Sequence, residues 1–230
     1  MFLFSLIHSG ASIPEILICV LALALAGGLS VIVHEIAHGY VALKCGDPTA
    51  KMYNRLTLNP AVHFDWMGLL MIVLVGFGWA KPVPVDPRNF RHYKRDMILV
   101  SVAGVTANII MGCIGLFLWH FMNSAFLVDA GAVVGVLQML GDYFLWFFIQ
   151  INFMQAFFNL LPIYPLDGFR ILDAFLPQGN RFSFFMKRYG GYCLLALVVL
   201  GNLFRYLGLQ RLDVFYWVNY LIRVMIVAVT

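Results

Sequence analysis

Charged residues are scarce in this chain of 230 residues. Lys, Arg, Asp and Glu make up 11% of it, whereas hydrophobic residues make up 62%. A soluble globular domain has about a quarter charged residues, so this composition excludes an ordinary soluble domain and favours a bilayer protein. The net charge of +4 is spread over loops without a long basic arm, which argues against nucleic acid as a partner. We interpret the basic residues as signals of membrane topology.

Paired cysteines and a basic N-terminal leader are also missing. The chain has no C-x-x-C, and its four cysteines stand apart at Cys19, Cys45, Cys113 and Cys193. This spacing predicts free, buried thiols and no disulfide framework. The residues Met1–Leu6 lack the basic region of a cleavable signal peptide. We therefore expect the first apolar segment to remain in the mature protein.

Long apolar segments fill most of the chain and predict an all-α membrane protein, a multi-pass helical bundle with about five to six such segments. We expect them at about residues 13–43, 66–79, 97–121, 132–161, 189–204 and 214–229. The segment 66–79 is short and lies between basic loops, so we predict that it is re-entrant. Three closely spaced prolines follow it and favour extended chain, which gives a re-entrant and extended stretch around residues 66–86.

The whole chain, residues 1–230, is expected to form a single integral-membrane domain. Its catalytic core would cover about residues 13–175, and a C-terminal helical hairpin would cover about 189–230. Arg205 and Arg211 fall in the turn of that hairpin, on the side where the positive-inside rule expects few basic residues. The orientation of the hairpin is therefore the least constrained part of this topology.

The first apolar segment contains His34-Glu35-Ile36-Ala37-His38, an H-E-x-x-H motif. On a helix the two histidines lie one turn apart on one face and can hold one Zn²⁺. Zinc lowers the pKa of bound water towards about 7, and Glu35 is near enough to accept the proton. With six His and two Glu in the chain, chance occurrence of the motif is on the order of one in a thousand. Three ionisable residues in a membrane segment also indicate a function.

The length of this first segment is itself informative. About thirty helical residues span roughly 45 Å, which exceeds the roughly 30 Å hydrocarbon core of a bilayer. Ser12-Ile13-Pro14 is a suitable helix start. Either the helix tilts or protrudes from the membrane, or Gly27-Gly28 divides it into two pieces.

A hydrolytic zinc site usually has three protein ligands and one open position, so a third ligand must come from elsewhere in the chain. Asp167 is the strongest candidate, because it follows a Pro-x-x-Pro break at the end of an apolar segment and Gly168 permits an unusual turn. An ordinary helix cap is the competing explanation for Asp167. The alternative ligands are Asp65, Asp142 and Asp173.

Three further polar residues have a structural explanation that is more frequent than a functional one. Asn108 and Asn159 lie in apolar segments, where asparagine commonly makes hydrogen bonds between helices. His63 is expected to be a loop histidine that is satisfied by backbone groups.

The H-E-I-A-H motif, followed about 125 residues later by N-L-L-P-I-Y-P-L-D-G, resembles the site-2 protease family of intramembrane zinc metalloproteases, peptidase family M50. The sequences G-W-A-K-P-V-P-V and A-G-V-T-A-N are similar to compact bacterial members without PDZ or CBS domains. The resemblance extends over about residues 30–175, and Tyr164 and Val105 depart from its usual pattern.

The resemblance implies a role for five residues. It implies His34, His38 and Asp167 as the ligands of one zinc ion. Glu35 would be the general base, and Asn159 would hold the substrate backbone or the oxyanion.

This family assignment implies an intramembrane zinc endopeptidase in the bacterial inner membrane, with transmembrane proteins as substrates and the active site towards the cytoplasm. We expect the stretch 79–85 to receive an unwound substrate by strand addition, with Trp79, Val83 and Val85 as pairing residues. A non-proteolytic zinc-binding membrane protein or a metal transporter is the alternative. A transporter would carry ionisable residues along several segments, whereas here they cluster at one site. Small-residue faces pack helices within a chain as readily as between chains, so a homo-oligomer is one of two alternatives.

Overall fold

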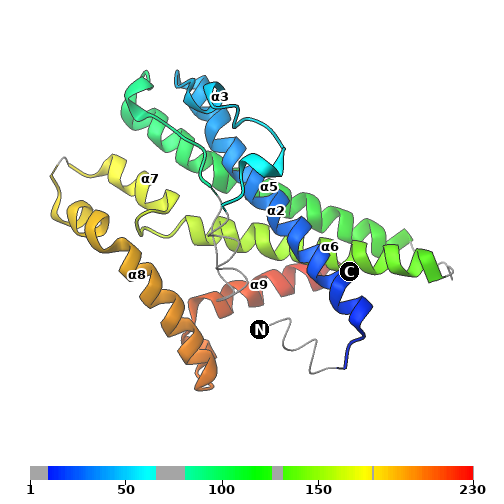
Figure 1. Ribbon diagram of the computed structural model, residues 1–230. Coiled ribbons are helices and arrows are strands. Elements are labelled where there is room, and N and C mark those ends of the chain that lie inside the picture. Colours follow the sequence, from blue (N-terminus) through cyan, green and yellow to red (C-terminus); the bar gives the residue numbers. More distant parts are fainter. Residues whose placement is uncertain (1–9, 66–80, 126–131, 178, 230) are drawn as a thin grey trace.

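The computed structural model describes residues 10–65, 81–125, 132–177 and 179–229 (Figure 1). This part of the chain is helical and contains no strand, which confirms the all-α class for the described residues. Its α-helices are α2 (Ile13–Lys44), α3 (Thr49–Met52), α5 (Tyr93–Ala125), α6 (Ala132–Asn159), α7 (Asp167–Phe175), α8 (Arg181–Tyr206) and α9 (Val214–Val229). Short 3₁₀ helices lie at Pro60–Val62, Pro87–Asn89 and Gln210–Leu212. The expected re-entrant segment 66–79 lies outside the described residues.

Helices α2, α5 and α6 pack against one another and form the centre of the molecule (Figure 1). At one end of this bundle, Cys19, Ala22 and Ala26 of α2 pack against Phe147 and Phe148 of α6. Small residues on α2 let the two helices approach closely, and the aromatic rings fill the space between them. Helix α9 contacts α5 and α6, and α7 contacts α5. Helix α8 stands to one side of the bundle.

Helix α2 is continuous over 32 residues, which excludes the second of the two alternatives, a division at Gly27-Gly28. It begins with a capping box in which Ser12 and Glu15 satisfy each other's backbone N–H groups, as the start at Ser12 suggested. A glycine costs a helix only about 1 kcal/mol relative to alanine. Opening the helix inside a membrane would leave backbone groups unsatisfied at several kcal/mol each, so the intact helix is favoured.

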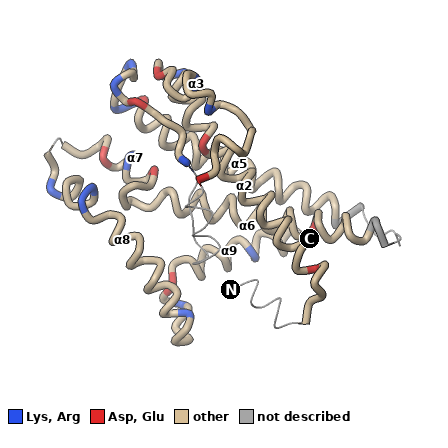
Figure 2. Tube along the Cα trace, in the orientation of Figure 1, with Lys and Arg blue, Asp and Glu red and all other residues tan. Residues whose placement is uncertain are grey.

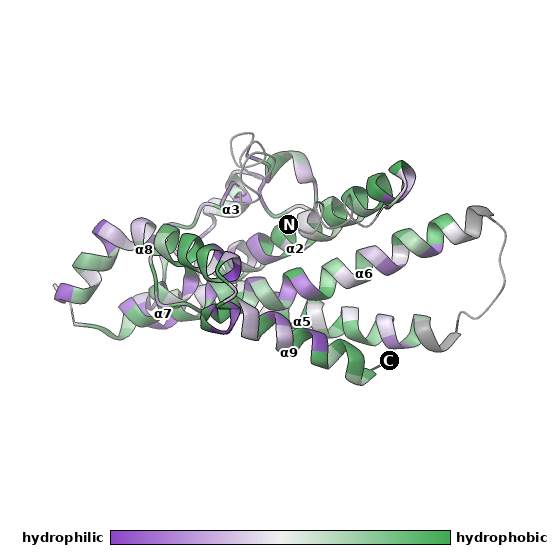
Figure 3. Cartoon of the chain, turned by 90° about the horizontal axis from the view of Figure 1, so that it is seen from below, coloured by the Kyte–Doolittle hydropathy of each residue, from purple (hydrophilic) through white to green (hydrophobic). Residues whose placement is uncertain are grey.

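Three helices of the described chain are long and apolar enough to cross a membrane: α2, α5 over Tyr93–Met122, and α8. Figure 3 colours each residue by hydropathy, and green, apolar residues recur along these helices. Helix α6 has 28 residues, but polar residues such as Gln150 and Asn152 interrupt its apolar sequence. Helix α9 has 16 residues and reaches about 24 Å, which is short of the roughly 30 Å core. The total of five to six apolar segments stays a prediction.

Eight of the 15 basic residues lie between Lys44 and Arg95, at one end of the bundle. Figure 2 shows these Lys and Arg positions around α3 and the start of α5, with few charges along the middle of the long helices. At the turn between α8 and α9, Arg205 Nε lies 2.7 Å from Asp213 Oδ2, and Asp213 is buried. This ion pair gives the buried Asp213 carboxylate a charged partner, and Arg205 still counts as a basic residue in the turn.

The four cysteines are free, as the sequence predicted. Cys19 and Cys45 are buried, Cys193 is half-buried, and Cys113 is exposed on α5. The expected burial therefore holds for two of the four, and an exposed thiol on an apolar helix is compatible with contact to lipid.

Candidate metal centre

His34 and His38 of α2 meet Asp167, the first residue of α7, in the interior of the bundle. All three are at least 94% buried. His34 Nε2 lies 3.0 Å from His38 Nε2, and Asp167 Oδ2 lies 3.4 Å from the first and 3.1 Å from the second. Within the described chain, these three form a group of His, Cys, Asp and Glu side chains able to hold a metal ion. The expected convergence of two histidines with Asp167 is therefore present.

Each histidine is held through its Nδ1 atom by an oxygen of α5. His38 Nδ1 lies 2.7 Å from the carbonyl oxygen of Val100, and His34 Nδ1 contacts Oδ1 of Asn108. A carbonyl oxygen only accepts, so Nδ1 of His38 carries the proton and donates it. If the same holds for His34, both neutral imidazoles present a lone pair at Nε2.

A proton on Nδ1 of His34 requires that Asn108 present its amide oxygen to the ring. A chain of buried hydrogen bonds fixes the Asn108 amide in this orientation. Ser30 Oγ donates to the Ala26 carbonyl oxygen at 2.7 Å and therefore accepts from Asn152 Nδ2 at 2.8 Å. The other end of the Asn152 amide, Oδ1, then accepts from Asn108 Nδ2 at 2.9 Å. Asn108 Oδ1 is left to face His34. Residues of α2, α5 and α6 thus set the tautomer of one histidine.

The three converging atoms fit a zinc ion. Two imidazole lone pairs and a carboxylate oxygen are all acceptors, and Asp167 Oδ2 is buried without a hydrogen-bond donor. Three such groups repel one another unless a cation lies between them. Ligands of a tetrahedral Zn²⁺ at 2.0–2.1 Å lie roughly 3.3 Å apart. The separations of 3.0, 3.1 and 3.4 Å match this spacing.

Two glycines allow the elements to approach closely enough to form the site. A Cβ atom on Gly104 of α5 would lie 2.6 Å from ring atoms of both histidines. A Cβ atom on Gly168 would lie 2.1 Å from the carbonyl oxygen of Leu160, at the end of α6. Gly168 is helical, so the unusual turn expected for it is wrong. Its importance lies in the close contact that brings Asp167 back to α2.

Glu35 is half-buried and lies beside the two histidines on α2. Its Oε2 atom accepts a hydrogen bond from the backbone N–H of Val83 at 2.8 Å. Because one carboxylate oxygen is held in this way, the other, Oε1, is left to accept a proton. The arrangement is suited to a general base next to a metal ion.

The alternative third ligands do not join this group. Asp173 lies further along α7, where it accepts from Ser183 and lies 2.8 Å from Lys187 Nζ. Asp142 lies in α6, and Asp65 lies in the loop after α3; neither belongs to the group.

The tentative substrate residues are found in different situations. Asn159 ends α6, and its Nδ2 donates to the Gln155 carbonyl oxygen of the same helix at 3.1 Å. Trp79 lies outside the described residues. Val83 is buried, and its N–H donates a hydrogen bond to Glu35. Val85 packs against Ala42, Cys45 and Val100. Their pairing with substrate stays a prediction.

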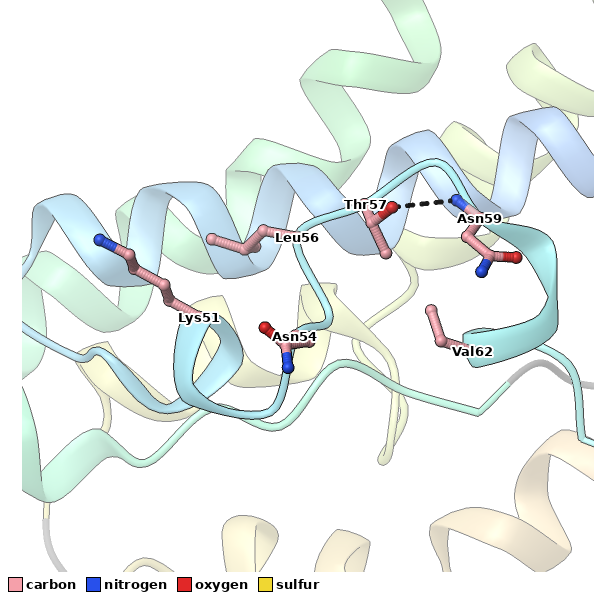
Figure 4. A pocket seen from close by; sticks show the side chains of 6 residues that line it. All are labelled: Lys51, Asn54, Leu56, Thr57, Asn59 and Val62. Atoms are coloured by element: carbon pink, nitrogen blue, oxygen red, sulfur yellow. Dashed lines mark hydrogen bonds between the residues drawn. The ribbon is translucent and has the colours of Figure 1, made fainter.

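His63 is buried, and its Nε2 lies 2.8 Å from the carbonyl oxygen of Thr57, so a backbone group satisfies one ring nitrogen as predicted, whereas Nδ1 is buried without a partner among the described residues. A shallow depression of about 350 Å³ lies on the same loop (Figure 4). Its lining residues are Lys51, Asn54, Leu56, Thr57, Asn59 and Val62. It includes none of the three ligand candidates, so it carries no part of the proposed chemistry.

The sequence interpretation missed the supporting role of α5. The signal was a four-residue spacing: Ser30, His34 and His38 share one face of α2, and Val100, Gly104 and Asn108 share one face of α5. When two apolar helices each carry polar or small residues at the same four-residue spacing, the two helices are predicted to pack against each other along these residues.

Replacing Asn108 with alanine is expected to weaken zinc binding by about 10–100-fold, because His34 Nδ1 loses the oxygen that orients it. Zinc affinity of the purified variants, measured by competition with a chelator, checks this. Asn202→Ala is the matched control, since that amide donates only to Val198 of its own helix. Equal zinc affinity of the Asn108 and Asn202 variants would contradict the supporting role.

Comparison with known proteins places the chain in a family. The family model for peptidase family M50 matches residues 22–201. YwhC of Bacillus subtilis is 44% identical over 153 residues, which cover 66% of this chain and 68% of the relative. Rip2 of Mycolicibacterium smegmatis is 31% identical over 206 residues, covering 86% and 73%. MJ0392 of Methanocaldococcus jannaschii is 23% identical over 197 residues, covering 80% and 47%.

All three relatives are named as zinc metalloproteases. No solved structure matches the chain. The matched range contains the two histidines, Glu35 and Asp167, and it extends from α2 into α8. The chain belongs to peptidase family M50.

Proposed function

We propose that this protein cuts transmembrane proteins within the membrane, close to its cytoplasmic face, as one integral-membrane domain. Its class follows from its family: it is a zinc metalloendopeptidase of the site-2 protease type, and Zn²⁺ is its cofactor. We assign His34, His38 and Asp167 as the zinc ligands and Glu35 as the general base.

The depth of the metal centre supports this proposal most directly. Both histidines lie on α2, a helix of 32 residues that is long and apolar enough to cross a membrane. They are about one and a half to three turns from its end at Lys44. The groups around them come from α5 and α6, which are also apolar. A peptide bond that reaches this site must enter among these helices, and a membrane-spanning segment is the substrate that lies there.

The distribution of basic residues supports a cytoplasmic position. Lys and Arg are absent from residues 1–43 and from residues 96–169, which include the ends of α2, α5 and α6 that lie furthest from the metal centre. The other end of these helices carries the basic loops. The basic residues there are Lys44, Lys51, Arg55, Lys81, Arg88, Arg91, Lys94 and Arg95. Basic loops remain in the cytoplasm by the positive-inside rule.

The chemistry uses the side chains described above. Bound zinc supplies a Lewis acid for the scissile carbonyl and makes a water molecule more acidic. Glu35 accepts a proton from the attacking water at its free oxygen and later delivers it to the leaving amine. Asn108 and Val100 keep the two imidazoles in the tautomer that binds metal. Asn159 is proposed to hold the substrate backbone or the oxyanion.

A transmembrane substrate must unwind locally, because a helix hides its amides in its own hydrogen bonds. We expect the unwound part to lie against the stretch 79–85, which Pro82 and Pro84 are expected to keep extended. The N–H of Val83 already donates a hydrogen bond to Glu35. A substrate strand that pairs at Val83 would therefore have to bond to carbonyl groups of the stretch or displace the contact with Glu35.

The proposed function predicts the position of the cut in a substrate. We expect the purified protein in proteoliposomes to cleave a single-pass model protein inside its apolar segment, in the half nearer the cytoplasmic flank. A glycine or asparagine near the cut should accelerate cleavage, because it lowers the cost of unwinding. Mass spectrometry of the fragments locates the bond.

A second substrate serves as the control, with the same cleaved sequence moved into a soluble linker. Preferential cleavage of the linker, or cuts confined to tails outside the membrane, would contradict the intramembrane proposal while leaving the enzyme class unchanged.

A further inference from the structure

Residues 81–86 cross the outside of α2 as a chain without regular secondary structure that is fixed at both ends; we call these residues the strap. At its first end, Lys81 donates its N–H to the His63 carbonyl oxygen at 2.8 Å, and its own carbonyl oxygen accepts from Arg55 Nη2 at 2.6 Å. Both His63 and Arg55 are buried. The first end is therefore held by backbone and by a buried guanidinium.

The second end is held by Asp47, which is fully buried just after α2. Its carboxylate accepts from Asp86 N at 2.7 Å and from Asn89 Nδ2 at 2.8 Å, as well as from Thr49. Burial raises the pKa of the Asp47 carboxyl, but these hydrogen bonds more than offset it and hold the pKa below its usual range. Asp47 thus remains an anion and anchors the strap.

Between the two ends, Val83 contacts α2 in two ways. Its N–H donates to Glu35 Oε2 at 2.8 Å. Its side chain is buried over Gly39, where a Cβ atom would come within 2.9 Å of Val83 Cγ1. Pro82 and Pro84 flank it and hold the chain extended, with no N–H groups of their own. Only one backbone donor in this part of the strap can reach the carboxylate.

We propose that the strap positions the general base: the Val83 N–H holds the Glu35 carboxylate, and Asp47 and Arg55 keep the strap in place for it. The assignment of Glu35 as the base rests on the proposed function. A half-buried carboxylate without such a contact could adopt several rotamers. Fixing one oxygen leaves the other in a constant position relative to the metal centre, and a displacement of 1 Å can cost about a hundredfold in rate.

The contact can be measured without any substrate. Because both neighbours of Val83 are prolines, Val83 carries the one amide hydrogen between Lys81 and Val85. Removing its acceptor with Glu35→Ala is expected to speed hydrogen exchange at Val83 by at least about tenfold. Glu15→Ala, at the far end of α2, is the matched control and should leave exchange at Val83 unchanged. Unchanged exchange in Glu35→Ala would overturn the proposal.

The kinetic test separates the N–H of Val83 from its side chain. Val83→Pro removes the donor while keeping an extended backbone, and it is expected to lower kcat by about 10–100-fold with KM unchanged. Val83→Ala keeps the donor and should lose much less kcat than Val83→Pro. Asp47→Ala, which loosens the strap without touching Glu35, should lower kcat in the same direction. Zinc content confirms that each variant is folded.

Three kinetic results would overturn the proposal. A higher KM with unchanged kcat would mean that the strap binds substrate and does not position the base. A higher kcat would mean that the contact inhibits Glu35. Equal losses of kcat in Val83→Pro and Val83→Ala would show that the packing of the Val83 side chain, and not its N–H, causes the effect. If Val83→Pro does not fold, the exchange experiment decides alone, and its result does not depend on which substrate the enzyme cuts.

Discussion

Replacing Glu35 with glutamine is expected to lower kcat by about 10²- to 10⁴-fold, the range typical of losing a general acid–base group. Glutamine has the same size and keeps an oxygen that can accept the Val83 N–H, so the strap stays in place. It cannot accept a proton from the attacking water. Cleavage of a single-pass substrate in proteoliposomes measures the loss, and atomic absorption measures the zinc that remains bound.

The chain provides an unusually close control, because it contains only one other glutamate. Glu15 belongs to the capping box at the start of α2, and glutamine serves in that position as well as glutamate does. Glu15→Gln should therefore cleave at the wild-type rate. Wild-type cleavage by Glu35→Gln with zinc still bound would show that the proposed base is wrong, and zinc loss would show that Glu35 also supports the metal.

Most of the helical elements and the members of the candidate metal group could be predicted from sequence because they depend on local patterns. The H-E-x-x-H spacing places His34 and His38 on one helix face whatever surrounds them. The capping sequence at Ser12 likewise determines where α2 begins. Asp167 could be proposed because proline ends the preceding helix close to it, although sequence alone left three other aspartates open.

The contacts that support the site could not be predicted, because they join residues that are far apart in the chain. His34 depends on Asn108 and Asn152, and Glu35 depends on Val83, 48 residues later. The role of Gly168 could not be predicted from the sequence for the same reason. A local interpretation of Gly168 suggests a turn, whereas the cause is a carbonyl oxygen of α6 that leaves no space for a side chain.

Removing the carboxylate of Asp167 is expected to abolish both zinc retention and cleavage. Asp167 is one of the three proposed ligands, so Asp167→Ala should weaken zinc binding by more than the roughly 10–100-fold that the loss of a supporting hydrogen bond costs. Asp167→Asn should give an intermediate loss, because its amide oxygen is neutral and a poorer ligand. Chelator competition measures the affinity, and the cleavage assay follows activity at saturating zinc.

Asp173 is the matched control, because it is an aspartate of the same helix and was an alternative ligand. Its carboxylate is 2.8 Å from Lys187 Nζ and accepts from Ser183, so it holds α8 against α7. Asp173→Ala should therefore destabilise the contact between these helices while zinc affinity stays at the wild-type value. The reverse pattern, with zinc lost in Asp173→Ala and kept in Asp167→Ala, would assign the third ligand to Asp173. That outcome would require α7 to turn, because in the structure Asp167 Oδ2 is the oxygen that both imidazoles face.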